Sequence, residues 1–291
     1  MPFMLETDKS QDPPRVHSEH DAEHDQDQED AESDSSEELP YDIPELAAIF
    51  VDFYQFLATL HYDPADLKMP PAEGWNTAIL PPAIVSSKSE EVVALLKVMP
   101  YFNENGRTTH VHYKSNLIDY TDPEQHDLAN SYEQILQDVL EDSQDDDKPS
   151  DYSRLLTIAG GYESGGRTLI LDVFNGEITE DIVRCSTCGP EHARNFFEDL
   201  KERFRSLQLI PCPGREIGGL RAPELDREIA EDEIRAQTEE WGTDLDWQFV
   251  RQVYRHYGWP DNFRSQEAFR FIDDFMAQIV DLREEWEPAF H

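Results

Sequence analysis

The sequence has few cysteines, no long apolar run and no secretion signal, and each absence narrows the class of protein. Cys185, Cys188 and Cys212 are the only thiols in 291 residues, and so small an odd number disfavours a disulfide framework and favours a reducing compartment. No stretch approaches the roughly 20 apolar residues of a membrane-spanning helix, and no basic start followed by an apolar run opens the chain. We therefore expect a protein of the cytoplasm, with the nucleus also open, and no membrane partner.

Basic residues are scarce too. Lys and Arg total 24 against 63 Asp and Glu, which gives a formal net charge of -39. Electrostatic repulsion then disfavours nucleic acid and anionic lipid as partners and favours a basic protein. The first 40 residues carry -12 of this charge and the other 251 carry -27, so the acidity extends well beyond the N-terminus.

Signatures of catalysis are also missing. The sequence contains no G-x-S-x-G, H-E-x-x-H or dinucleotide-binding fingerprint. The glycine-rich segment 160–166 is similar to a phosphate-binding loop, but Arg167-Thr168 and a predicted strand follow it where a P-loop has Lys, Ser or Thr and a helix. We interpret it as a hairpin turn, whose rim would hold Tyr162, Glu163 and Arg167 as candidate binding residues. Neither a catalytic residue nor a cofactor is predicted.

Residues 1–40 are rich in Asp, Glu, Gln, Ser and His and have almost no large apolar side chain after Leu5. They cannot bury enough surface to offset the entropy of ordering, so we expect a disordered acidic tail. Ser33, Ser35 and Ser36 lie among acids in a pattern that an acid-directed kinase could use. A purely solubilising role is the more common one for such tails.

The apolar periodicity that follows predicts an alternation of helices, strands and turns. The segment RLLTIAGGYESGGRTLILDVFNGEITEDIV reads as three strands, with Asn175-Gly176 in a type I′ turn, and an amphipathic helix follows with Leu200 inward and Lys201 outward. Before this segment, the sequence predicts a helix over 45–60, a proline-rich connection around Trp75 and a helix opened by a capping box at 87–90. A strand over 109–120 and a helix from 128, which ends in an acidic loop over 141–151, come next. After the segment, we expect a helical stretch over 222–240, a helix through Trp247, Val250, Tyr254 and Tyr257, and a last helix through Phe269, Ile272, Met276, Ile279 and Trp286.

The order of these elements resembles the SUKH superfamily, which includes fungal cell-wall-integrity regulators and bacterial toxin-immunity proteins. The matching features are the N-terminal helix, the proline-flanked Trp75, the glycine pairs of segment 160–166 leading to LILDVFNGEI, and the closing helix with Phe196, Phe197 and Leu200. The resemblance covers about residues 45–210, and its motifs are diffuse glycine and apolar positions. It implies an α+β domain with a mixed, curved sheet and flanking helices, used to bind other proteins without a cofactor.

The expected fold is therefore α+β, in three parts. Residues 1–40 would be the disordered tail, residues 41–214 the SUKH-like domain, and residues 215–291 a helical C-terminal extension packed on that domain. Trp75 joins the three rim residues as a candidate for binding. Trp259, beside Pro260 at a helix end, is a further aromatic residue that could reach a partner, although aromatics at helical spacing are usually core.

Two sets of residues are candidate metal ligands. Cys185 and Cys188 form a C-x-x-C that could act as a redox pair, and with His192 and Cys212 they could bind structural zinc. A single C-x-x-C is a weak signal, and ordinary loop cysteines are the favoured interpretation. His110 and His112 alternate on a predicted strand and share a face, but two histidines are short of a full ligand set. We therefore predict no metal.

These observations favour a non-enzymatic, intracellular protein-binding or regulatory module of the SUKH type, acting in cell-wall or stress signalling on a basic partner. Two alternatives stay open. One is a hydrolase or transferase that uses carboxylates or the Cys185/Cys188 pair, and a deep pocket lined by ionisable groups with shifted pKa values would favour it. The other is a nucleic-acid mimic that occupies a basic cleft of its partner. The oligomeric state is not indicated.

Overall fold

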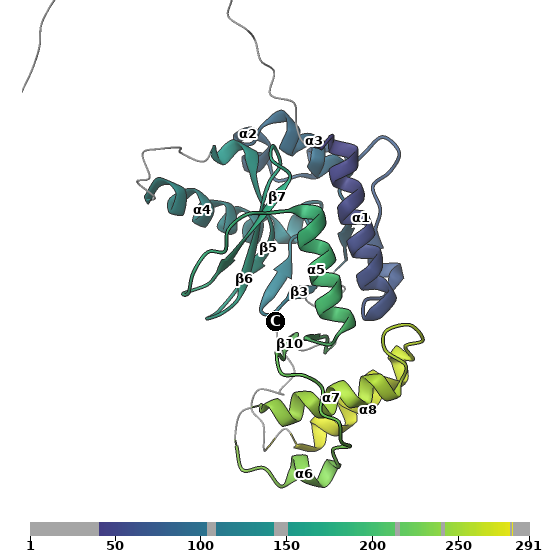
Figure 1. Ribbon diagram of the computed structural model, residues 1–291. Coiled ribbons are helices and arrows are strands. Elements are labelled where there is room, and N and C mark those ends of the chain that lie inside the picture. Colours follow the sequence, from purple (N-terminus) through teal and green to yellow (C-terminus); the bar gives the residue numbers. More distant parts are fainter. Residues whose placement is uncertain are drawn as a thin grey trace, which may run out of the picture. The chain divides into compact units, whose positions relative to one another are not determined.

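A six-stranded antiparallel sheet with helices on both faces forms the centre of the protein (Figure 1). The computed structural model describes residues 41–103, 109–142, 151–212, 216–239, 242–279 and 281; the tail over 1–40, most of the acidic loop and Trp286 lie outside these residues. The predicted α+β class is confirmed. The mixed strand directions that the resemblance implied are wrong, because every pairing in the sheet is antiparallel.

The strand order of the large sheet follows the chain, β3-β4-β5-β6-β7-β8, so each strand lies next to its sequence neighbour. Two short antiparallel pairs accompany it, β1 with β2 and β9 with β10. The strands are β1 Leu67–Lys68, β2 Tyr101–Phe102, β3 His110–His112, β4 Ser115–Leu117, β5 Leu155–Gly161, β6 Arg167–Asp172, β7 Glu177–Ile182, β8 Glu191–His192, β9 Leu209–Ile210 and β10 Gly218–Gly219.

The helices cover the sheet unequally. α1 and α5 lie together over one face and pack aromatic side chains between them, whereas α4 lies on the opposite face against β5 (Figure 1). The helices are α1 Ile43–Leu60, α2 Pro82–Ser87, α3 Glu90–Val98, α4 His126–Asp142, α5 Ala193–Arg205, α6 Glu231–Arg235, α7 Asp244–His256 and α8 Ser265–Ile279.

The packing of α1 on α5 explains why α1 is so apolar. Phe53 of α1 stacks on Phe197 of α5 with ring centroids 4.5 Å apart, and Phe50 meets the same ring edge-on at 5.1 Å. Among the described helices, α1 is also the one whose length and mean hydropathy would suit a membrane span. Half of that stretch is buried inside the protein, so packing in the core accounts for its composition.

Strand alternation divides β6 and β7 between the two faces of the sheet. Leu169 and Leu171 are fully buried toward α1 and α5, while Thr168 and Ile170 point to the other face and stay partly exposed. On β7, Ile178 pairs with Leu171 and is buried on the same side. The two strands predicted on either side of Asn175-Gly176 are therefore present, with one face buried and the other partly exposed.

The turn between β6 and β7 lies where the sequence places it but has another geometry. Asp172 pairs with Glu177, so the loop holds four residues, and within it only Gly176 has a positive φ, of 66°. A two-residue type I′ turn would need positive φ at Asn175 as well. The Asp172 carboxylate instead accepts the N–H groups of Phe174 and Asn175, both at 2.9 Å, and stabilises the longer loop.

Three other predictions need correction. The single strand predicted over 109–120 is a tight hairpin of β3 and β4, because Lys114 takes a positive φ and turns the chain. Lys201 is 4% exposed rather than outward, because it lies where α5 meets α1 and pairs with Asp52 and Glu198. Helix within 222–240 is confined to α6.

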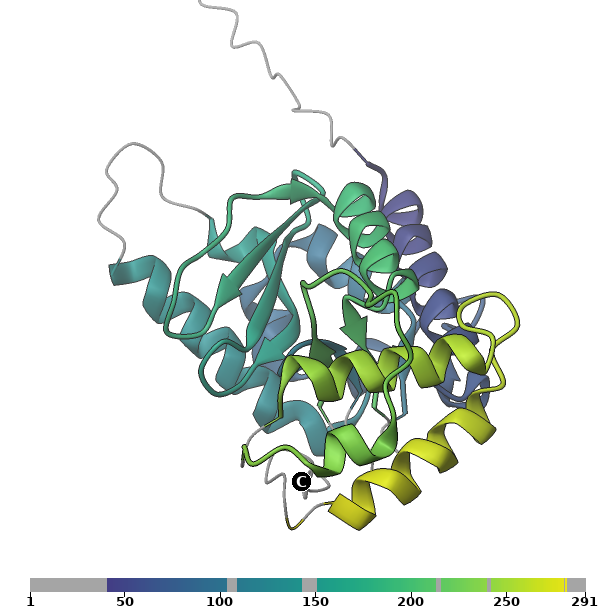
Figure 2. The same ribbon diagram turned by 60° about the horizontal axis from the view of Figure 1, so that its bottom comes forward.

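The C-terminal helices attach to the rest of the protein through backbone carbonyls. Arg251 of α7 is 2% exposed and donates to the carbonyls of Leu207, Leu220 and Ala222 at 2.9 to 3.2 Å. Trp259 is also buried, and its indole N–H donates to the Phe204 carbonyl at 3.0 Å. The suggestion that Trp259 reaches a partner is therefore wrong. Figure 2 shows α7 lying beside the β9–β10 pair, and α8 contacts α7.

On the opposite face, a buried ion pair joins α4 to the segment that precedes α3. The Lys88 ammonium lies 2.5 Å from the Glu133 carboxylate, with side chains 0% and 3% exposed. The other Glu133 oxygen accepts the Thr157 N–H of β5 at 2.8 Å and the Tyr120 hydroxyl at 3.3 Å. Burial lowers the pKa of Lys88, and the nearby Glu133 carboxylate opposes that shift.

We expect Glu133→Gln to lower the free energy of unfolding by about 3 kcal/mol, because Lys88 then stays buried without a counter-charge. The double variant Lys88→Met/Glu133→Gln should recover most of this loss, since the amide oxygen still accepts from Thr157 and Tyr120. Urea denaturation measures both values. A single variant within about 1 kcal/mol of the native protein would contradict this role for the ion pair.

Candidate functional site

An elongated depression separates α4 from the outer face of β6 and β7, and we call it the α4 groove. Its volume is about 610 Å³. The α4 side contributes Ile135 and Val139, whose side chains are 57% and 60% exposed, and Ile170 of β6 lies on the sheet side. Within the described residues, no other part of the protein covers these large apolar side chains.

Carboxylates border the α4 groove along the hairpin. Asp172, Glu177 and Asp181 alternate onto the outer face of the sheet and line the groove, where Arg184 is the only described cation among its lining residues. Asp181 accepts the Thr187 hydroxyl at 2.6 Å. The groove therefore combines apolar walls with an acidic rim.

The glycine pair at the end of β5 shapes one end of the α4 groove. Tyr132 of α4 lies so close to Gly160 that a Cβ there would meet its ring at 2.1 Å. The Tyr132 hydroxyl donates to the Gly161 carbonyl at 3.2 Å. Glycine at position 160 thus allows α4 to approach the sheet, a packing role that the hairpin interpretation of this segment did not include.

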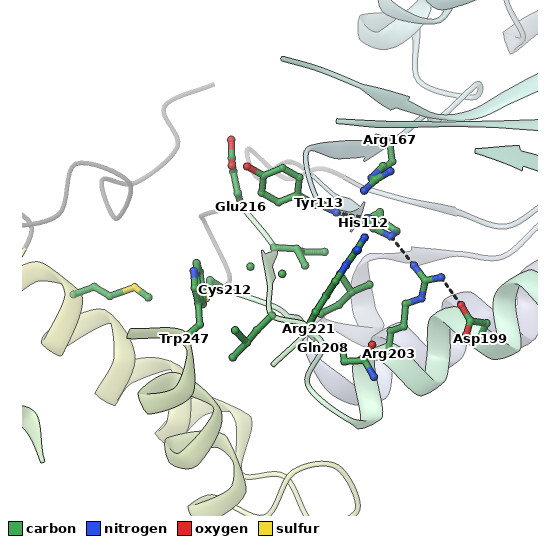
Figure 3. A pocket seen from close by; sticks show the side chains of 16 residues that line it. His112, Tyr113, Arg167, Asp199, Arg203, Gln208, Cys212, Glu216, Arg221 and Trp247 are labelled. Atoms are coloured by element: carbon green, nitrogen blue, oxygen red, sulfur yellow. Dashed lines mark hydrogen bonds and ion pairs between the residues drawn. The ribbon is translucent and has the colours of Figure 1, made fainter. Parts of the chain in front are cut away.

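A second cavity, of about 660 Å³, lies on the other side of β6, and we call it the arginine pocket (Figure 3). It is bordered by the end of β3 and the start of β6, by α5, by the β9–β10 pair and by α7. The described residues that line it are His112, Tyr113, Arg167, Asp199, Arg203, Gln208, Leu209, Cys212, Glu216, Ile217, Gly218, Gly219, Leu220, Arg221, Trp247 and Met276.

His112 has the most perturbed ionisation in the arginine pocket. It is 4% exposed, and burial together with repulsion from Arg167 and Arg203 lowers its pKa to about 3. His110, the other histidine of this predicted strand, is buried as well. His112 is neutral at physiological pH.

The rim residues predicted from the sequence lie beside the arginine pocket, and Trp75 does not. The Tyr162 hydroxyl is 3.1 Å from His110 Nε2 and donates to Glu216 at 3.4 Å, and Glu163 pairs with Lys114 at 2.7 Å. Arg167 lines the pocket itself. Trp75 lines a separate cavity and donates its indole N–H to the Met99 carbonyl at 2.8 Å.

The cysteines are not brought together. Cys185 and Cys188 are exposed in the turn after β7, Cys212 is buried, and His192 precedes α5. Within the described ranges, no three His, Cys, Asp or Glu residues are grouped closely enough to hold a metal ion. The C-x-x-C precedes α5, which begins at Ala193, and β8 lies between them in the chain.

Sequence reasoning did not single out the α4 stripe or the convergence of arginines. The stripe had a signal in the sequence, because Tyr132, Ile135, Leu136 and Val139 recur at helical spacing. In the structure, only Leu136 among these four residues is buried. No sequence pattern indicates that Arg203 and Arg221 share a cavity. Arg203 is on α5 and Arg221 follows β10, and only the tertiary fold brings them together.

Comparisons with known proteins place no constraint on these sites. No protein-family model matches the sequence, and neither curated proteins nor solved structures give a match. The resemblance to the SUKH superfamily thus depends on the residues quoted for it and on the element order.

We expect His112 to stay neutral from pH 8 down to pH 5 in an NMR titration. Its pKa is below the roughly 6.5 of an unfolded histidine, so its contribution to stability is complete above pH 6.5 and is lost as the pH falls toward 3. Arg203→Gln should raise this pKa by removing one repelling charge, while burial, the larger cause, keeps it below 6.5. Arg194→Gln, an exposed change on the same helix, is the control; titration of native His112 near 6.5 would contradict the assignment.

Proposed function

We propose that this protein is a non-enzymatic binding module of the SUKH type, which captures a partner segment containing basic and apolar side chains in the α4 groove. The observation that carries the proposal is the placement of exposed apolar residues. Six large apolar side chains are exposed in the described part of the chain, and three of them, Leu128, Ile135 and Val139, are on α4. Clustering of this kind marks interaction surfaces.

Charge selects the partner. The acidic rim of Asp172, Glu177 and Asp181 borders the apolar walls, and the chain as a whole carries -39. A segment that alternates Lys or Arg with Leu, Ile or Phe would bury its apolar groups between α4 and Ile170 while its cations meet the rim. Long-range attraction would raise the association rate in a salt-dependent way.

The pKa values and the placement of the ionisable groups fit a binding protein better than an enzyme. General acid–base chemistry works best with a group whose pKa lies near the working pH, and the strongly shifted group of the arginine pocket, His112, moves far below it. Cys185 and Cys188 are exposed, and within the described residues they do not belong to a group of three His, Cys, Asp or Glu that could hold a metal ion. A regulatory role in cell-wall or stress signalling is the part of the proposal that depends on the SUKH resemblance alone. A location in the cytoplasm or the nucleus depends instead on the small, odd number of cysteines.

Selection of peptides from a random displayed library tests the groove. We expect enriched peptides to combine Lys or Arg with large apolar residues, and their affinity, measured by fluorescence anisotropy, to fall as salt rises. Ile135→Asp and Val139→Asp should each weaken binding about tenfold or more, because each removes an apolar contact worth about 1.5 kcal/mol or more.

Met69→Asp is the matched control, since Met69 is 45% exposed and lies outside the groove. This variant should bind the selected peptides like the native protein. Peptides that bind the α4 variants with native affinity, or that carry no excess of basic residues, would show that the groove is not the binding surface.

A further inference from the structure

Three arginines converge on the arginine pocket. Arg167, Arg203 and Arg221 enter it from β6, α5 and the segment after β10. Figure 3 shows Arg221 reaching across the pocket toward His112, with Arg167 and Arg203 directed to the same region. Guanidinium groups are donors only, so their convergence calls for an acceptor.

The tautomer of His112 adds a further donor. Its Nδ1 accepts the Tyr113 N–H at 2.7 Å, and a neutral imidazole that accepts at one nitrogen carries its proton on the other. The Nε2 atom therefore presents an N–H to the pocket. It faces Arg203 Nη1 at 3.5 Å, which is a donor facing a donor.

Arg167 is only partly satisfied. One of its terminal nitrogens pairs with Glu180 at 3.2 Å. Its Nε–H is buried and has no hydrogen-bond partner. A buried unmatched donor on a charged group is costly, and such groups normally have a ligand, ion or water.

Arg221 carries the uncompensated charge. It is exposed, and no hydrogen bond or ion pair involves it within the described residues. The neighbouring carboxylates are engaged elsewhere, because Asp199 pairs with Arg203 at 2.6 Å and Glu216 lies near Lys114 and Tyr162. The unused donors thus surround a space that these carboxylates do not fill.

Apolar groups form the rest of the wall. Leu209, Ile217 and Leu220 line the pocket, together with the ring of Trp247. That ring packs directly on Gly218, where a Cβ would meet it at 2.4 Å. A ligand held here by its charge would place an apolar body against these side chains.

We propose that the arginine pocket binds a small organic oxyanion with an apolar body, such as a carboxylate or a phosphate monoester. Arg221 supplies the main counter-charge, and the Arg203 and Arg167 guanidinium groups and the His112 Nε2–H donate to the oxygens. Charge-assisted hydrogen bonds to guanidinium groups are short and strong, and a cavity of about 660 Å³ has the volume typical of small-molecule sites. The pocket shares no lining residue with the α4 groove, so this proposal and the proposed function fail or hold separately.

Isothermal titration calorimetry with phenyl phosphate, 3-phenylpropionate and the uncharged 3-phenylpropanol tests the site. We expect one-to-one, saturable binding of at least one anion at millimolar concentration or below, and binding of the alcohol about tenfold weaker or worse. Saturation by phenyl phosphate alone or by 3-phenylpropionate alone supports the proposal and assigns the class of oxyanion. Absence of binding by both anions, or equal affinity for the alcohol, overturns it.

Arg221→Gln separates a ligand role from a structural one. The variant should lose anion affinity about tenfold or more, yet melt at or above the native temperature without ligand, because like-charge repulsion is removed. Arg194→Gln, an exposed arginine outside the pocket on α5, should keep native affinity. Equal affinity in the two variants, or a clearly lower melting temperature of ligand-free Arg221→Gln, overturns the assignment.

Discussion

The antiparallel register of β6 against β7 places the side chains of both candidate sites. Arg167 pairs with Ile182 and Asp172 with Glu177 at the two ends of the ladder, and the pleat sends alternate side chains to opposite faces. Residues in step with the buried Leu169 and Leu171 therefore include Arg167, which meets the arginine pocket. Those out of step, Thr168, Ile170 and Asp172, line the α4 groove. A slip of one residue would exchange the two sets and bury charge in the core, so core packing and site geometry constrain the same register.

A pocket rich in arginine within so acidic a chain follows from how far charge acts. Screening limits the reach of exposed charges to about 8–10 Å at physiological salt, so the net charge of -39 governs approach, while the nearest groups govern what stays bound. Arg167 and Arg203 are each tied to one carboxylate, which allows them to lie close to Arg221 with less mutual repulsion. The same acidity that would steer the proposed basic partner to the α4 groove would not prevent an anion from occupying a pocket whose first contacts are donors.

Patterns local in the chain were predictable, and contacts distant in the chain were not. The helical period of α1 and α5 and the alternation of β6 and β7 follow from residue spacing alone. Lys201 follows the polar face of α5 in the sequence, yet the fold sets it against Asp52 of α1. Trp259 lies at a helix end in the sequence, where an exposed side chain is expected. The chain returns beside α5, however, and the Trp259 indole N–H donates to the Phe204 carbonyl. In both cases the missing information is which segment lies alongside, and a single sequence does not encode that in any local period.

The two sites share a strand but no described lining residue, and this bears on whether they communicate. Coupling between sites requires an element with two arrangements that both ligands bias. Between the α4 groove and the arginine pocket stands β6, fixed by the β5 and β7 ladders and by the buried Leu169 and Leu171. A strand held in this way offers a ligand on one face no second arrangement to favour. Substitutions in the groove and in the pocket should therefore act additively, as independent sites do, and the two proposed sites would work as separate faces of one scaffold rather than as parts of an allosteric switch.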